Sequence, residues 1–425
     1  MILPKFGLIH QLTPETPEPD VDRLLQDELA RSPLLAEVRR GERVLLTAGS
    51  RGINSKPKVL AGLVKVLKAA GAEPFIYPAM GSHGGGTAAG QVGVLADLGI
   101  TAETIGAPIY DKWESVRIGT TEAGAPVFVD RAALDADRVV LVNRIKEHTD
   151  YIGTTESGLI KIAVVGLGRQ PGAAAMHQVA IDRGMQNAIH DAARVIFRNL
   201  KVVGGVAILE DRHNTLRRLE AVPVGKLFDR EPELFRESQE HKPRLPFDRF
   251  DLLIVDEIGK EFSGTGADSK VLGRIMNRFE SECTAPAIKR VVMLDLTEKT
   301  HGNAIGIGLA DYTTLGLVAK IDYQKTNLNC ITGGRVELGK VPIALATDRE
   351  AIEAGLKTLG LWTPESLRAL WIGDTKNLSV LAASDGLLRE AASRADLAVD
   401  ERPPFDLPFN PDGSLKRLKT LVPLH

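Results

Sequence analysis

The sequence predicts an α/β protein of two domains, each with a parallel or mostly parallel sheet flanked by helices. Short runs rich in β-branched and other apolar residues alternate with helical patterns along most of the chain. Near-continuous apolar strands of this kind are typical of sheets that are buried on both faces. A length of 425 residues is enough for two or three domains of ordinary size.

The first strand and helix show the pattern clearly. Residues 43–50 predict a strand and residues 56–70 predict a helix, with Asn54 or Ser55 as its cap and Gly71 as its end. A second helix is predicted at residues 88–98. Further strands are predicted at residues 74–80, 138–143, 202–209, 252–255 and 290–294.

A polar stretch with two prolines, residues 239–246, is the candidate linker, and a new strand pattern begins at Phe250. We therefore expect an N-terminal α/β domain at residues 1–246 and a C-terminal α/β domain at residues 250–399. The active site is expected in the cleft between these domains. The proline-rich tail, residues 400–425, is expected to lie extended over the surface, where it could pack back on the first domain.

Composition and charge exclude several classes of protein. The formal net charge is −2 and no long basic run is present, which does not fit a nucleic-acid binder. No apolar stretch approaches the roughly 20 residues that span a membrane, and the first residues do not resemble a signal peptide. The two cysteines, Cys283 and Cys330, lack zinc-site spacing and are too few for a disulfide framework. We expect a cytoplasmic protein with no nucleic-acid or membrane partner.

Three polar side chains follow predicted strands at their carboxyl ends, where open α/β sheets bind ligands. Arg51 follows the strand at residues 43–50, His83 follows the next strand, and His148 follows a third. Parallel topology would bring these three side chains toward one crevice. The glycines around His83 would let the backbone approach a ligand closely. A glycine turn with an exposed histidine is the alternative interpretation.

Residues 143–177 contain the most informative pattern of the chain. Lys161 lies in an apolar run between His148 and His177. An ammonium group in apolar surroundings is costly unless it is paired, neutralised or covalently modified. Lys161 is therefore a candidate attachment point, and the histidines are candidate acids, bases or metal ligands. Each residue alone has an ordinary structural explanation, so the hypothesis depends on their combination.

These residues resemble the nickel-pincer-nucleotide enzymes typified by lactate racemase. That family has a glycine-led histidine segment after a strand, as at His83, and an arginine after an earlier strand, as at Arg51. It also has a second histidine before a Gly-rich stretch that ends in a lysine, as at His148 and Lys161. A nickel-ligating histidine follows that lysine at the spacing found here for His177.

The resemblance implies a cofactor, the nickel complex of pyridinium-3-thioamide-5-thiocarboxylic acid mononucleotide. It would be bound covalently at Lys161, and His177 would be its protein ligand to nickel, which suits soft sulfur and imidazole donors. Gly166 and Gly168, in the same stretch, would contact the cofactor. The enzymes that synthesise this cofactor would then be partners of the protein.

The implied reaction is racemisation or epimerisation of a 2-hydroxy acid, by hydride transfer to and from the cofactor. His83 and His148 would be the acid/base pair on opposite faces of the reacting carbon. Arg51 would bind a carboxylate or polarise the reacting oxygen.

The second domain departs from the lactate racemase pattern, because the expected Tyr-Gln…Lys substrate motif is absent and residues 256–268 stand in its place. Lys260 would replace the missing lysine, and Ser263 with Thr265 would bind the nucleotide phosphate or an acidic substrate group. A structured loop after a buried strand is the equal alternative. The loop at residues 300–314 would serve domain closure or substrate contact. These departures count against lactate as the substrate more than against the cofactor.

Three other functions stay open. The first is an oxidoreductase that uses the same cofactor on another substrate. The second is a non-catalytic carrier of the nickel cofactor, which would not need both His83 and His148. The third is a zinc-dependent sugar-acid enzyme, which no H-E-x-x-H or cysteine-pair motif supports. The sequence identifies neither the 2-hydroxy acid nor the oligomeric state.

Overall fold

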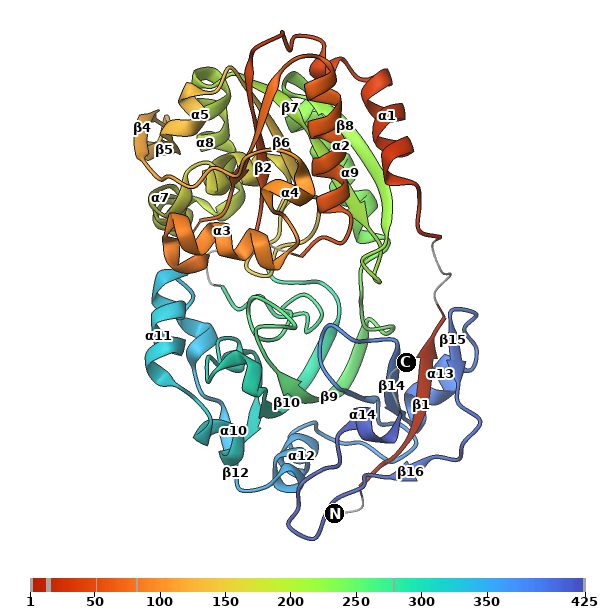
Figure 1. Ribbon diagram of the computed structural model, residues 1–425. Helices are drawn as coiled ribbons and strands as arrows, with labels where there is room; N and C mark the ends of the chain where they lie inside the picture. The colour runs from red at the N-terminus through yellow and green to blue at the C-terminus, as the bar shows by residue number, and fades with distance from the viewer. Residues whose placement is uncertain (1–2, 13–16, 51, 82, 278–279, 423–425) are drawn as a thin grey trace. The chain divides into compact units, whose positions relative to one another are not determined.

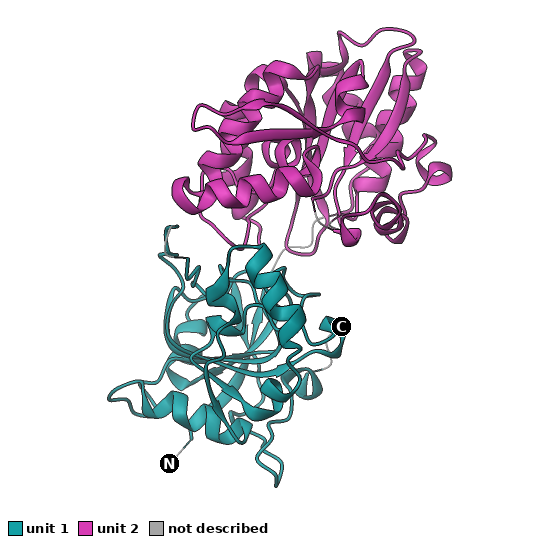
Figure 2. Ribbon diagram, turned by 90° about the vertical axis from the view of Figure 1, so that its left-hand side faces the viewer, with its two compact units in different colours: residues 1–15, 243–425 teal, residues 16–242 magenta. Residues whose placement is uncertain are grey.

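The computed structural model describes residues 3–12, 17–50, 52–81, 83–277 and 280–422 (Figure 1). The chain forms two compact units, which consist of residues 16–242 and of residues 1–15 with 243–425 (Figure 2). The first strand and the tail therefore belong to the C-terminal unit. The division expected from the sequence is different. It assigns the first strand to the N-terminal domain and allows the tail to pack on that domain.

The N-terminal unit, residues 16–242, has a sheet with strand order β3-β2-β6-β7-β8, in which only β8 is antiparallel to its neighbour. Its strands are β2 (Arg43–Ala48), β3 (Glu73–Pro78), β6 (Arg138–Arg144), β7 (Val202–Glu210) and β8 (Leu216–Pro223), with a separate hairpin of β4 (Ser115–Thr120) and β5 (Pro126–Asp130). Its helices are α1 (Val21–Arg31), α2 (Lys56–Ala69), α3 (Ala88–Asp97), α4 (Ala102–Ile105), α5 (Arg131–Asp135), α6 (Leu159–Lys161), α7 (Arg169–Arg183), α8 (Met185–Asn199) and α9 (Leu227–Gln239).

The C-terminal unit has a larger mixed sheet, with strand order β12-β11-β10-β9-β13-β14-β1-β15 and with β16 paired to β1. The strands from β12 to β13 in this order are parallel, and those from β14 onward are antiparallel. They are β1 (Lys5–Gln11), β9 (Arg249–Ile258), β10 (Ala287–Leu296), β11 (Tyr312–Thr314), β12 (Ile343–Leu345), β13 (Ala369–Ile372), β14 (Val380–Ser384), β15 (Leu397–Val399) and β16 (Phe405–Asp406). The helices are α10 (Leu315–Ala319), α11 (Tyr323–Thr332), α12 (Asp348–Lys357), α13 (Asp385–Ala391) and α14 (Leu418–Leu421).

The fold class is α/β, with mostly parallel sheets that helices flank, as the apolar strands predict. In β2, Leu45 packs with α7, α8 and α9, whereas Val44 and Leu46 pack with α1 and α2 on the other face. In β9, Leu253 and Ile254 likewise join different cores. Burial on both faces explains the continuous apolar runs. Within the described residues, no helix is both long and apolar enough to cross a membrane.

The predicted helix after the first strand forms as α2, with Ser55 at its N-cap and Gly71 beyond its end at φ 81°. This positive φ favours glycine, which explains the end of the helix. The hydroxyl of Ser55 makes no cap hydrogen bond, contrary to the usual role of serine at this position.

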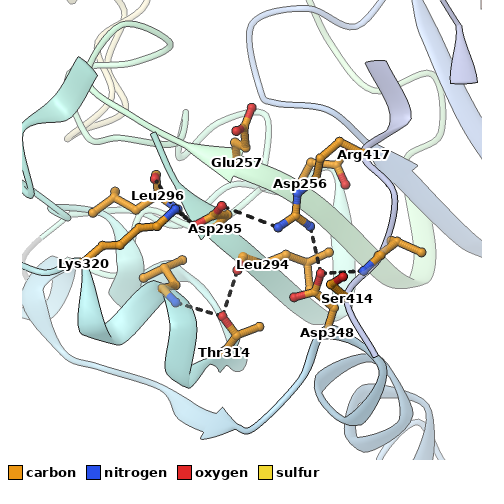
Figure 3. A network of polar contacts seen from close by, with 12 residues as sticks. Asp256, Glu257, Leu294, Asp295, Leu296, Thr314, Lys320, Asp348, Ser414 and Arg417 are labelled. Carbon is orange, nitrogen blue, oxygen red and sulfur yellow. Dashed lines mark hydrogen bonds and ion pairs between the residues drawn. The ribbon is translucent and has the colours of Figure 1, made fainter. Parts of the chain in front are cut away.

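Carboxylates in the C-terminal unit form hydrogen bonds and ion pairs with its C-terminal tail, residues 400–425 (Figure 3). Asp256 of β9 accepts hydrogen bonds at 2.6 Å from the indole N–H of Trp371 and the backbone N–H of Leu418. Arg417 lies 3.1 Å from Asp348 and 3.6 Å from Asp295. Burial raises the pKa of Asp256 to about 7. The tail is therefore part of the core of this unit.

Replacement of Leu418 by alanine is expected to destabilise the C-terminal unit, because this side chain is buried in the core that α12 also covers. The loss should be about 2 kcal/mol, at the lower end for a buried leucine. Urea unfolding of the full chain measures it. Leu361→Ala is the matched control, since Leu361 is fully exposed, and an equal loss in both variants would contradict the packing role.

Candidate active site

His83 follows β3 and starts a turn of three glycines, residues 84–86. Their φ values of 63°, 67° and 67° lie in the region that favours glycine. The buried side chain of Gln91, from α3, donates to the carbonyl oxygens of Met80 at 2.8 Å and Gly81 at 3.1 Å. The backbone that leads to the exposed His83 is thus fixed from behind.

Arg169, at the start of α7, connects this turn to the rest of the site. Its Nη1 donates to Oε1 of Gln91 at 2.5 Å, and its Nε lies 2.7 Å from the hydroxyl of Tyr77 and 2.8 Å from Oδ2 of Asp130. Arg169 and Asp130 are both buried. The hydrogen bond to Gln91 therefore connects the backbone before His83 to the helix that contains His177, and the ion pair with Asp130 connects that helix to β5.

His148 lies in the loop after β6. Its backbone N–H donates to Oε2 of Glu156 at 2.6 Å, and Oε1 of the same buried carboxylate accepts the N–H of Gly153 at 3.1 Å. The imidazole packs on the ring of Tyr151, with 5.1 Å between centroids. The backbone N–H of Asp150 donates to Nδ1 of His148 at 3.2 Å, and Oδ2 of Asp150 lies 3.7 Å from the same nitrogen. Both the loop and the imidazole are held in place.

Lys161 ends the short helix α6, which Glu231 of α9 anchors. Oε2 of Glu231 accepts the backbone N–H groups of Leu159 and Ile160, both at 2.9 Å. Burial raises the pKa of this carboxyl to about 7, against the lowering effect of the two hydrogen bonds. A π-helical turn, Ile162–Gly166, follows Lys161 directly. Such turns are rare in proteins as a whole, and many of those that occur lie at functional sites.

His177 lies half-buried on α7, and the charges around it show which predicted residues come together. Burial is the main reason why its pKa is lowered; nearby Asp150 raises it, and nearby Lys161 lowers it further. The net lowering favours a neutral imidazole at pH 7. Asp150 is also close to His148. Asp150 therefore lies near both His148 and His177, and Lys161 lies near His177.

Gly166 and Gly168 are required by packing. A Cβ at Gly166 would lie 2.8 Å from Cγ1 of Ile162, and one at Gly168 would lie 2.5 Å from the carbonyl oxygen of Val164. Close packing accounts for both glycines, so their predicted contact with a cofactor stays a prediction.

Lys260, Ser263 and Thr265 belong to the C-terminal unit, in the loop after β9. The Nζ of Lys260 donates to Oδ1 of Asn329 at 2.8 Å. The hydroxyls of Ser263 and Thr265 are buried and lie 3.2 Å apart, and Thr265 donates to the carbonyl oxygen of Ala267 at 2.7 Å. These contacts match the structured-loop alternative, and the predicted binding roles are untested.

Arg51 lies outside the described residues. In the sheet, β2 lies between β3 and β6, so His83 and His148 follow strands on either side of β2 at one carboxyl edge. Sequence reasoning did not identify Asp150, Glu156, Arg169 or Glu231. Asp150 and Glu156 lie inside the informative segment, and their acidic character was an available signal. Glu231 is far from Lys161 in sequence, and no local pattern marks it.

Comparisons with known proteins give limited further information. Residues 45–228 match a family described as a domain of unknown function, DUF362. No curated protein is significantly similar to the chain. Among solved structures, the lactate racemase apoprotein of Thermoanaerobacterium thermosaccharolyticum is similar at 15% identity and a TM-score of 0.46, covering 73% of this chain and 90% of that one. The family match spans less than half of the chain and describes no activity.

Proposed function

We propose that this protein is a racemase or epimerase of a 2-hydroxy acid, with a nickel pincer nucleotide bound covalently to Lys161. The observation that supports it most is the position of His177, which lies close enough to Lys161 for the lysine charge to lower its pKa. An attachment lysine and a neutral imidazole beside it are the two protein groups that this cofactor needs.

The donor set of the site fits the cofactor. Within the described ranges, no group of three His, Cys, Asp or Glu side chains is placed to hold a metal ion. A metal bound by His177 would therefore need its other ligands from a bound organic group. A pincer nucleotide provides these ligands, and when bound it supplies a reversible acceptor for hydride.

The chain itself supplies proton transfer. When His148 is protonated, the carboxylate of Asp150, which lies 3.7 Å from Nδ1, would stabilise its positive charge. Its Nε2–H is then available to a substrate oxygen, and loss of that proton leaves Nε2 as a base. His83 would donate and accept a proton on the other face of the substrate carbon.

The test is intact-protein mass spectrometry with nickel analysis, after co-expression with enzymes that synthesise the cofactor. An adduct mapped to Lys161, with about one nickel per chain as the single-imidazole site predicts, would support the proposal. It would then justify a screen of 2-hydroxy acids for loss of optical purity. A folded protein that has met the cofactor but contains neither adduct nor nickel would refute it.

His83→Ala and His148→Ala are each expected to lower turnover by roughly 10²–10⁴-fold, because each histidine moves the proton on one face. Polarimetry of the loaded enzyme measures the rate, and nickel content should stay unchanged. His241→Ala is the control, since His241 is partly exposed beyond the end of α9, with its Nδ1 3.3 Å from Nη1 of Arg217. Near-normal turnover of either alanine variant would rule out the two-base scheme.

A further inference from the structure

A second cluster of charged groups lies at the carboxyl edge of the N-terminal sheet. From β2 the chain moves to β3 on one side, and from β6 it moves to β7 on the other. The point between β2 and β6 is therefore the topological switch point, where open α/β sheets bind their ligands. Lys56, at the start of α2, and Arg144, at the end of β6, both lie there.

These two cations share one close carboxylate, that of Glu210 at the end of β7. Nη1 of Arg144 bonds to Oε2 of Glu210 and, at 3.1 Å, to Oδ1 of Asn214. Oε1 of Glu210 accepts the backbone N–H of Asn54 at 3.1 Å. The Nζ of Lys56 donates to the carbonyl oxygen of Gly49 at 2.6 Å. The cluster thus joins the ends of three strands.

The cluster is largely buried. The exposed fraction is 1% for Lys56 and 8% for Glu210, and that of the Arg144 side chain is 14%. Burial and the charge of Arg144 lower the pKa of Lys56 to about 7, against the opposite effect of Glu210. The neighbouring Asp211 accepts the backbone N–H groups of His213 and Thr215 in its own turn. Burial beside Arg144 disfavours the charged form of Lys56, and an anion bound next to both side chains would offset this effect.

Two hydrogen-bond donor atoms of this cluster have no partner within the described part of the chain. They are Nε of Arg144 and Oγ of Ser55, and both are buried. Ser55 is 6% exposed and stands at the N-cap of α2 without capping it. Buried polar atoms of native proteins nearly always have a partner, so these two point to one that binds from outside.

We propose that Lys56, Arg144 and Ser55 form a binding site for an oxyanion, the carboxylate or phosphate group of a small ligand. An oxyanion accepts hydrogen bonds from guanidinium, ammonium and hydroxyl groups together, and charge-assisted bonds of this kind are strong. The site does not depend on the proposed function, because it can be tested in the chain without cofactor. If the oxyanion site were disproved, the proposed racemase or epimerase function would not be affected.

The experiment is calorimetric titration of the full chain with sulfate, which represents a phosphate group, and separately with lactate, which represents a carboxylate. Lys56→Met is expected to weaken binding of the preferred probe at least about tenfold, through loss of a charged hydrogen bond. Lys58→Met should leave binding unchanged, because Lys58 is exposed on the same helix and pairs with Glu18 at 3.1 Å. The probe that binds more tightly identifies the source of the oxyanion.

Proton uptake gives a second measurement that needs no variant. A bound anion raises the pKa of Lys56, so binding near pH 7 should take up protons, which titrations in buffers of different ionisation enthalpy detect. Neither probe titrates near this pH. Binding of neither probe, binding without proton uptake, or equal weakening by Lys56→Met and Lys58→Met would overturn the proposal.

Discussion

Replacement of Lys161 by alanine is expected to abolish covalent loading of the cofactor and, with it, all turnover. The lysine amine is the group that would form the bond, and alanine has no group that can form it. It lies between a helix start that Glu231 anchors and a π-helical turn. Intact-protein mass after co-expression measures the loss directly.

Lys161→Arg separates charge from bond formation. Arginine keeps the positive charge beside His177 but cannot be acylated in the same way. We expect this variant to fold, to keep the lowered pKa of His177 and to contain no adduct. Lys201→Ala is the control, because Lys201 is an exposed lysine of the same unit, 3.7 Å from Asp137. An adduct of unchanged mass in Lys161→Arg would show that attachment occurs elsewhere.

Strands β2, β3, β6, β7, β9 and β10 were predictable from sequence, because burial on both faces requires continuous apolar runs. Val202–Glu210 and Ala287–Leu296 lie where such runs predict them. The place of β1 was not predictable, since its pairing with β14 depends on a strand more than 300 residues away. The tail likewise packs through Leu407, Leu415, Leu418 and Val422, apolar residues that are scattered without a regular period in a proline-rich stretch. Long-range pairing leaves no local pattern.

The candidate site was predictable where one segment supplies it. His148, Lys161 and His177 lie within 30 residues of each other, and the structure places Asp150 near both histidines and Lys161 near His177. The groups that hold them were not predictable. A buried carboxylate such as Glu231 looks in sequence like any acidic residue of a surface helix. Only the fold shows that it faces the interior.

Glu231→Gln is expected to stabilise the N-terminal unit at pH 8 and to change its stability by less than about 1 kcal/mol at pH 5. Because the carboxyl has a pKa of about 7 when folded and an ordinary value of 4.5, the folded state binds its proton more tightly. Its contribution to stability is complete below 4.5 and is lost as the pH rises through 7. Between these limits the wild type loses about 3 kcal/mol of its free energy of unfolding. The glutamine variant does not lose this amount, because its side chain does not titrate.

Urea unfolding of the wild type and the variant at the two pH values measures this effect. Asp256 in the C-terminal unit also has a pKa of about 7, so the comparison at each pH is between the wild-type chain and Glu231→Gln, and not between pH values alone. Glu233→Gln is the matched control, because Glu233 is an exposed residue of the same helix that pairs with Arg230. Identical pH profiles for wild type and Glu231→Gln would show that the carboxyl is not buried in solution.

Glu231→Ala tests the connection between this carboxyl and Lys161. It leaves the buried N–H groups of Leu159 and Ile160 without their acceptor, at a cost of roughly 1–3 kcal/mol each at pH 5. Hydrogen exchange of these two amides should accelerate well beyond that of the strand amides in β6. Glutamine keeps an acceptor oxygen, so Glu231→Gln should restore slow exchange. Covalent loading of Lys161 should likewise be lower in Glu231→Ala than in Glu231→Gln. A lysine on a segment that opens often spends less time in the position where attachment occurs. If loading fell while exchange stayed slow, Glu231 would affect Lys161 by its charge and not by holding the backbone.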